Sequence, residues 1–561
     1  MSKKYTLIPS SGLSLALLAT LAGALGAQAQ TPIDAYRLTQ PDLKGTARFM
    51  SMGGAFGALG GDLSSLSQNP AGIGVYRSSE IGFTLDLDAQ STNSKAYGAN
   101  NSLSNTHFYL NNIGGVLTLR LPSQSVPNLN FGFTYNKSSS FNRRYGGGIG
   151  RLANSVTNYI AGLSNSEGYT VADLAGDKNY DPYNPIGGIA PNWLSVLGYE
   201  SYFMSYDGDP NAPVWKGQWG QSTSGFANYE VEESGCIDSY NLALGGNINN
   251  VVFWGMDFDI SYLNFTTHTM YQETLNDSYV PDDYFYTDYQ GVQKSNSDLG
   301  LYNDYKVTGT GFNYKLGIIV KPIQELRIGF AFHTPTWYRL TESFYANTDF
   351  RYGDAGEIEN KQFEQKETNG GFIGTNDVNL RTPWKIIASV AGVIANRFIV
   401  SADYEWANYG AMKFSDPYSY SWDAGGRYDS FSHTNNLMSQ YYRSTNTLRL
   451  GAEFRVLPQF SVRAGYSFVS SPVTPAAADN RMGIETAGTM PQYRFDDTTN
   501  YITAGLGYRY KKFYADLAYV YKHMKSTYHA FTPDPGSDIP SPQASLSFNN
   551  SQIVLSAGFK F

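Results

Sequence analysis

The chain contains few arrangements of side chains that could do covalent chemistry. A serine hydrolase places its nucleophile in a Gly-x-Ser-x-Gly turn, and the nearest segment, Gly220-Gln-Ser-Thr-Ser224, ends in serine instead of glycine. The six histidines lack the spacing of metal ligands; they are His107, His268, His333, His433, His523 and His529. We therefore predict that the protein is not an enzyme and has neither a metal site nor a cofactor.

Charged side chains at alternate positions of several segments could instead form an ion path. They are Asp257, Asp259, Asp403, Glu405, Arg449, Glu453, Arg455, Arg463 and Arg509. Acids and bases occur together, and pairing offsets the cost of removing a confined charge from water. We expect a ladder of paired charges inside the protein.

These charged segments also carry apolar residues at every second position. The last segment of the chain is the clearest case, with one face made of Ile553, Leu555, Ala557, Phe559 and Phe561. A β-strand places alternate side chains on opposite faces, so each segment has an apolar side and a polar side. A final strand of this kind that ends in phenylalanine resembles the closing strand of a bacterial outer-membrane β-barrel.

About fourteen strands can be counted in this way. Their approximate positions are 79–88, 106–120, 127–137, 237–248, 251–263, 305–320, 325–338, 379–394, 397–408, 445–456, 459–469, 498–510, 512–522 and 550–561. Short connections alternate with long ones, the long ones being 89–105, 138–236, 264–304, 339–378, 409–444, 470–497 and 523–549. This asymmetry is typical of outer-membrane barrels. It predicts an all-β fold, a transmembrane antiparallel β-barrel of about fourteen strands with both chain ends periplasmic. A secreted β-sandwich would share the alternation but not the sorting of loop lengths.

Composition favours the same class. Aromatic residues make up 15% of the chain, with 44 tyrosines, and glycine occurs 57 times. Tyrosine and tryptophan suit the two interfaces of a membrane, and glycine suits crowded inward faces of strands. Beyond the N-terminal segment no apolar run reaches 18 residues, which excludes membrane-spanning helices. The net charge of −8 argues against a nucleic-acid partner.

The N-terminus resembles an export signal. Lys3 and Lys4 precede an apolar stretch over 12–26, and Ala27-Gln28-Ala29 provides a small-x-small cleavage pattern. We predict a signal peptide over 1–29 and an outer-membrane location in a Gram-negative bacterium. An uncleaved membrane anchor is the alternative, although the apolar stretch is short for a span.

Residues 30–78 show no strand alternation and contain a glycine-rich stretch over 50–62, followed by Asn69-Pro70-Ala71. A phosphate-binding loop would continue with Lys-Ser/Thr, which is absent. A periplasmic linker is one interpretation. A plug inside the barrel is the other, and it gives burial to Phe56, Leu59 and Leu63 where a linker would not.

The Asn-Pro-Ala tripeptide after the glycine-rich stretch resembles the N-terminal hatch of the FadL/TodX family of outer-membrane transporters. Further resemblance lies in Leu110-Asn-Asn-Ile-Gly114, His333-Thr-Pro-Thr-Trp337 and Thr382-Pro-Trp384. The resemblance covers residues 30–561. It implies a hatch over 30–78 inside a barrel over 79–561, with a hatch motif of Gly53, Gly54, Asn69, Pro70, Ala71 and Gly72. It also implies that cargo leaves sideways at a kink in the third strand, which we place at Tyr135, Asn136 and Lys137, where the alternation is lost.

The connection 138–236 is much longer than a simple loop and is rich in aromatic residues. We predict a long extracellular insertion there, which either binds hydrophobic ligands or packs on itself as a small lid. The candidate ligand-binding residues are Phe56 in the hatch and Trp193, Tyr202, Phe203 and Trp215 in the insertion.

Together these features predict passive uptake of long-chain fatty acids or other hydrophobic compounds by a monomeric barrel. Outer-membrane lipid would surround it, and the barrel assembly machinery would recognise its C-terminal strand. The alternatives are an assembly or secretion-associated barrel of the same family, or a barrel that binds a ligand such as haem. An open aqueous porin is disfavoured because the hatch would occlude the lumen.

Overall fold

The computed structural model describes residues 30–561 apart from 41, 186–189, 280–285, 288–292, 354–357, 396, 418–430, 480–481, 487 and 534–540. The predicted signal peptide over 1–29 lies outside the described residues. Within the described part of the chain, no helix is long and apolar enough to cross a membrane.

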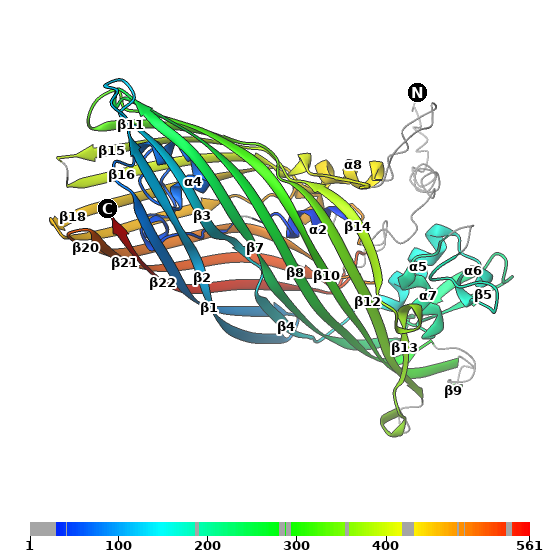
Figure 1. Ribbon diagram of the computed structural model, residues 1–561. Coiled ribbons are helices and arrows are strands. Elements are labelled where there is room, and N and C mark those ends of the chain that lie inside the picture. The colour runs from blue at the N-terminus through cyan, green and yellow to red at the C-terminus, as the bar shows by residue number, and fades with distance from the viewer. Residues whose placement is uncertain are drawn as a thin grey trace, which may run out of the picture.

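Fourteen antiparallel strands form a closed barrel (Figure 1). Closure joins the first strand, β1 (Glu80–Ala96), to the last, β22 (Gln543–Lys560), with Leu85 opposite Leu555. The apolar side chains Ile81, Phe83 and Leu87 of β1 point outward and are exposed. The predicted all-β transmembrane barrel of fourteen strands is therefore confirmed.

Some of the fourteen barrel strands consist of two pieces. The pieces in chain order are β1, β2 (Ala99–Arg120), β3 (Asn128–Ser140), β4 (Arg143–Ile149), β7 (Ser224–Ile248), β8 (Val252–Ser278), β10 (Gln293–Val320), β11 (Leu326–His333), β12 (Trp337–Gly353), β14 (Gly374–Arg381), β15 (Lys385–Ile394), β16 (Phe398–Asn408), β17 (Lys413–Ser415), β18 (Ser444–Leu457), β19 (Phe460–Val469), β20 (Tyr493–Tyr510), β21 (Phe513–His529) and β22. The split strands are β3 with β4, β11 with β12, β15 with β14, and β16 with β17.

Several strands continue far into the connections that the sequence predicted to be loops. β1 and β2 occupy most of 89–105, and β8 and β10 occupy much of 264–304. The reason is that the sense of the alternation reverses beyond Tyr262. Leu263 and Phe265 then point inward and are buried, whereas the outward positions carry Thr266 and His268. The part of the wall beyond Tyr262 encloses a hydrophobic core and has a polar outer face. The outward apolar pattern that predicts membrane strands is therefore absent from it.

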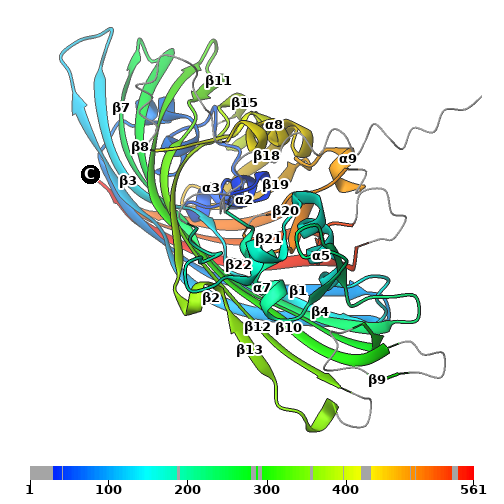
Figure 2. The same cartoon turned by 90° about the vertical axis from the view of Figure 1, so that its right-hand side faces the viewer.

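The N-terminal segment, residues 30–78, for which we keep the name hatch, lies inside the barrel and forms short helices instead of strands. They are α2 (Pro32–Arg37), α3 (Ala47–Ser51), α4 (Ser65–Gln68) and the 3-10 helix η2 (Pro70–Val75). Figure 2 shows α2 and α3 inside the ring of strands. Gln30 is buried and its side-chain amide donates to Glu342 on β12. Phe561, by contrast, pairs with the backbone of Ser79 at the end of the barrel that has the short turns.

Glycines on the inner wall allow the hatch to lie directly against the strands. A Cβ atom on Gly317 would lie 1.9 Å from the side-chain oxygen of Asn69, and one on Gly255 would lie 2.1 Å from the carbonyl oxygen of Pro70. Glycine was expected on crowded inward faces of the strands. At these two positions it is required, because no larger residue fits between the wall and the hatch.

The connection 138–236 forms the largest structure outside the barrel wall. Its first residues belong to β3 and β4, and its last thirteen belong to β7, so the predicted insertion is shorter than 138–236. Between them lies the loop module, residues 150–223. It contains α5 (Val156–Glu167), α6 (Val171–Ala175), α7 (Trp193–Glu200) and the hairpin of β5 (Met204–Asp207) and β6 (Val214–Gly217). Figure 1 shows it at the end opposite the C-terminus.

Shorter elements complete the loops at that end. They are β9 (Tyr286–Thr287), η4 (Ile358–Asn360), β13 (Glu364–Glu367), η5 (Thr368–Gly371), η6 (Tyr409–Ala411), α8 (Ser432–Tyr441) and α9 (Pro475–Ala478). α8 packs on α2 of the hatch, and Tyr36 stacks on Tyr442 with ring centroids 4.9 Å apart. The hatch is therefore held at both the wall and the loops.

Candidate functional site: a lumenal cavity beside a break in the third strand

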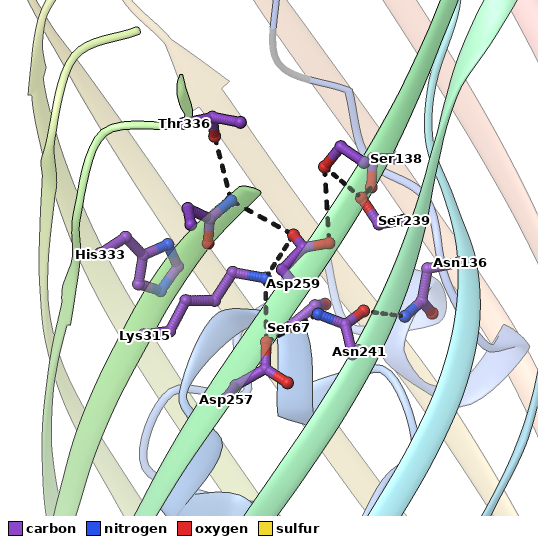
Figure 3. A network of polar contacts seen from close by, with 12 residues as sticks. Ser67, Asn136, Ser138, Ser239, Asn241, Asp257, Asp259, Lys315, His333 and Thr336 are labelled. Carbon is purple, nitrogen blue, oxygen red and sulfur yellow. Dashed lines mark hydrogen bonds and ion pairs between the residues drawn. The ribbon is translucent and has the colours of Figure 1, made fainter. Parts of the chain in front are cut away.

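A cavity of about 250 Å³ lies between the hatch and the barrel wall. The hatch contributes Thr39, Lys44 and Gln68 to its lining, while the wall contributes residues from β3, from its neighbours β7, β8 and β10, and from strands further around the barrel. Figure 3 shows part of the polar network on this wall, where Lys315 reaches both Asp257 and Asp259. The cavity is partly open, and its lining of hatch residues and inward-facing strand residues places it within the lumen.

The third strand is interrupted where it borders the cavity. The hydrogen-bonded register between β2 and β3 runs from Arg120 opposite Asn128 to Asn112 opposite Asn136, where it stops. On the other side of β3, the register with β7 shifts between Lys137 and Ser139, so that Ser138 is an extra residue. A bulge of this kind bends a strand and ends its pairing.

The three residues predicted for the third-strand kink lie at this break. The Asn136 amide accepts a hydrogen bond from Asn112 at 2.6 Å and donates one to Asn241 at 2.9 Å. Lys137 lies 3.1 Å from a carboxylate oxygen of Asp238, which also accepts a hydrogen bond from Tyr135 at 2.8 Å. Polar contacts therefore hold β3 to β7 where it leaves β2.

Most charges of the predicted ladder are paired with an opposite charge on the inner wall, whereas Asp403 accepts from the Gly57 N–H and the Gln68 amide of the hatch, and Arg455 and Arg509 are exposed. Arg449 lies 2.7 Å from Glu405, and Arg463 lies 2.7 Å from Glu453 and 2.6 Å from Asp516. Such pairing is the arrangement that a confined charge requires. Among the described residues, no group of three or more His, Cys, Asp or Glu side chains is arranged to hold a metal ion.

Further ion pairs connect three charged residues of the hatch to oppositely charged residues of the wall strands. The pairs are Lys44 with Asp86 at 2.8 Å and Asp88 at 3.1 Å, Arg48 with Glu453 at 3.1 Å, and Asp42 with Lys522 at 3.0 Å. Burial alone would raise the pKa of the Asp42 carboxyl, but Lys522 and Lys44 outweigh burial and lower that pKa to about 2. The hatch is thus electrostatically fixed at neutral pH.

The residues of the predicted hatch motif form the turn that presses on the wall. Gly53 and Gly54 have positive φ angles of 62° and 76°, which glycine adopts without strain. The side-chain oxygen of Asn69 accepts from the Ala71 backbone N–H at 3.1 Å, and its amide donates to the Gly57 carbonyl at 2.6 Å. Pro70 occupies the first turn of η2, where its missing N–H costs nothing.

Replacing Asn69 with alanine is expected to loosen the hatch, because it removes both the cap of η2 and the tie to Gly57. The loss of such a buried cap costs about 1–2 kcal/mol. Single-channel recording should show more frequent opening than in the wild type. The matched control is Asn211→Ala, which removes the local hydrogen bond from the Asn211 amide to Asp209 in an exposed turn of the loop module. Identical recordings for Asn69→Ala and wild type would exclude a gating role for Asn69.

The predicted ligand-binding aromatic residues do not line this cavity. Trp193, Phe203 and Trp215 are buried in the core of the loop module, and Trp193 packs on Phe344 of β12 with centroids 4.9 Å apart. Phe56 is buried in the hatch, whereas Tyr202 is 41% exposed. Their placement favours the self-packed alternative for the loop module, and ligand binding by them stays a prediction.

The sequence missed a second set of cavity residues at two proline breaks. The predicted strands 325–338 and 379–394 are each divided, at Pro335 and Pro383, because proline cannot donate to the strand ladder. The breaks face each other, and the Thr336 N–H donates to the Thr382 hydroxyl at 2.8 Å. The two prolines are the signal in the sequence for these breaks, although apolar and polar residues alternate on both sides of them.

A family sequence model described as outer membrane protein transport protein (OMPP1/FadL/TodX) matches residues 248–561, more than half of the chain. The chain belongs to this family. The resemblance expected from the hatch and strand motifs is therefore confirmed. FadL/TodX proteins are channel-type transporters of hydrophobic compounds in the outer membrane, and they act as monomeric barrels and not as enzymes.

Solved structures similar to the chain include three of this type. A FadL homologue of Pseudomonas aeruginosa is 13% identical, with 93% of this chain and 99% of that chain covered and a TM-score of 0.49. The toluene transporter TbuX of Ralstonia pickettii is 14% identical with a TM-score of 0.45, and TodX of P. putida is 12% identical with a TM-score of 0.46. Both cover 93% of this chain and 99% of their own. No curated protein matches the chain.

Proposed function

We propose that the protein mediates passive uptake of long-chain fatty acids or other hydrophobic compounds, and that cargo leaves the lumen sideways into the membrane. The observation that carries this proposal is the end of the β2–β3 register at Asn112 and Asn136, beside the cavity over the hatch. A hydrophobic molecule that leaves through the wall avoids the aqueous space below the hatch, so its own partitioning drives transport.

In this proposal the short turns and the C-terminus lie on the periplasmic side. The signal peptide over 1–29 directs export, the hatch spans 30–78, the barrel spans 79–561, and the insertion within 138–236 is extracellular. Outer-membrane lipid of a Gram-negative bacterium surrounds the exposed apolar side chains, such as Phe131, Leu242 and Leu316. The barrel assembly machinery recognises the C-terminal strand. Docking of cargo on Trp193, Phe203 and Trp215 would require the loop module to open, since all three are buried.

Uptake of radiolabelled oleate and toluene by cells tests this proposal. The host lacks its own transporters of this family and expresses either the protein or an empty vector. We expect the protein to increase the initial uptake rate of at least one of the two compounds severalfold. If neither rate exceeds the empty-vector control while folded protein is present in the outer membrane, the uptake function is wrong and an assembly or secretion role takes precedence.

A further inference from the structure

The lining of the lumenal cavity is amphiphilic. Apolar side chains come from Leu38, Leu43 and Ile387, while hydroxyl groups come from Thr334, Thr336 and Thr447. The hydroxyl oxygen of Thr336 already accepts from the Asn313 amide and that of Thr334 from the Tyr314 N–H, but each oxygen can accept a further hydrogen bond that a purely apolar compound would not supply. The lining therefore matches a molecule that has both an apolar part and hydrogen-bonding groups.

Every lysine and arginine that lines the cavity already has a carboxylate partner. Lys315 lies between Asp257 and Asp259, Lys137 pairs with Asp238, and Lys44 pairs with Asp86 and Asp88. Arg449 and Lys385 share Glu405, at 2.7 Å and 3.7 Å respectively. With Asp42 and its partner Lys522 included, six cations face seven carboxylates. An incoming carboxylate would find no unpaired cation among these groups and would have to displace an existing partner.

Two lining residues also have side-chain oxygens without a partner among the described protein groups. These atoms are Oε1 of Gln68 and Oδ1 of Asn313, and both residues are buried. Their amide nitrogens are already used, by Asp403 in the case of Gln68 and by Thr336 in the case of Asn313. Both oxygens have almost no exposed surface in this structure, so a ligand hydroxyl or amide N–H satisfies them only after a small rotation of the Gln68 or Asn313 side chain.

The size of the cavity sets how much of a ligand it can hold. An apolar cavity of about 150 Å³ holds one benzene molecule, so 250 Å³ accommodates about ten non-hydrogen atoms. That is the size of a small headgroup with its first chain carbons.

We propose that this cavity binds the headgroup of a neutral amphiphile, one that carries hydroxyl or amide groups and no ionised carboxylate. The inference rests on the proposed uptake function and selects among its hydrophobic cargoes. The apolar tail lies along the leucine and isoleucine side chains, and the headgroup donates to Gln68 and Asn313 while the charges of the wall stay paired.

The test compares initial uptake rates of three labelled ten-carbon probes at pH 7.5: 1-monodecanoylglycerol, decanoate and decane. Wild-type cells should take up monodecanoylglycerol at least about fivefold faster than decanoate, a ratio that one or two hydrogen bonds can supply. Equal or faster uptake of decanoate or decane would overturn the headgroup inference while leaving the uptake function intact. If no probe exceeds the empty vector, the uptake function itself fails.

A charge variant tests the electrostatic part separately. Asp259→Asn removes one carboxylate from the cavity lining and should raise the ratio of decanoate uptake to monodecanoylglycerol uptake about threefold or more. The control, Asp304→Asn, removes an exposed carboxylate on the same strand as Lys315 and should change neither rate. Heat-dependent gel migration verifies that each barrel is folded. An unchanged ratio in Asp259→Asn would contradict the proposal.

Discussion

Replacing Lys44 with methionine is expected to release the hatch from the barrel wall. The ammonium group is almost completely buried between Asp86 and Asp88, and it also donates to Gln552 at 3.1 Å. Removing one partner from a buried ion pair costs about 3–5 kcal/mol, because the remaining carboxylates stay buried without a counter-ion. Two carboxylates lose their counter-ion here, so we expect the upper part of that range. Planar-bilayer recording should reveal a large, persistent conductance where the wild type is mostly closed.

The control for this variant is Lys216→Met, which breaks an ion pair with Asp207 that is more than half exposed on both sides. Exposed ion pairs contribute little to stability, so this variant should give the same bilayer current recordings as the wild type. Both proteins should retain the heat-dependent migration of a folded barrel, because the strands do not depend on either lysine. A closed Lys44→Met channel would mean that the remaining contacts hold the hatch without this pair.

Deleting Ser138 is expected to abolish most uptake while leaving the barrel folded. Ser138 is the extra residue in the register between β3 and β7, and the register between β2 and β3 stops two residues before it. Without the bulge, β3 can continue alongside β2 and complete its hydrogen bonds, which closes the proposed exit. We expect the uptake rate of the preferred hydrophobic probe to fall by about tenfold or more.

The matched control is Ser138→Ala, which removes the hydroxyl contact to Ser239 but keeps the number of residues in the bulge. It should transport at a rate close to that of the wild type. A folded deletion variant that transports normally would show that cargo does not leave between β2 and β3.

The sequence was most informative where lipid contacts the wall. In the membrane-facing part of each strand, exposed apolar residues such as Phe133 and Ile502 alternate with buried ones, and the strand positions follow from that period of two. Beyond Tyr262 the outer face becomes polar and the inner face apolar, so the same rule placed loops where the strands continue. The need of Phe56 and Leu63 for burial favoured a plug over a linker, and both side chains are buried, while the role of residues 30–78 as a hatch stays a prediction.

The candidate site was only partly visible in the sequence. Loss of alternation after Tyr135 coincides with the bulge at Ser138, since a bulge disturbs the period locally, and the role of this kink as a cargo exit stays a prediction. The cavity itself could not be predicted, since Gln68, Lys315 and Arg449 are far apart in the chain and meet only through closure of the barrel. Composition also could not distinguish a docking surface from a packed core. Trp193 and Phe203 have the aromatic character of a ligand-binding surface, yet both are buried.

Photo-crosslinking of cargo to the purified protein in lipid nanodiscs tests the central claim most directly. A ten-carbon neutral amphiphile with a diazirine on its tail is bound, irradiated and mapped by peptide mass spectrometry. The account predicts labelled residues along the cavity and the break, such as Ile387, Gln68 and Ser138, with competition by unlabelled probe. Labelling confined to outward residues such as Phe131 and Leu242, without competition, would show that the probe only dissolves in the surrounding lipid and would contradict passage through the lumen.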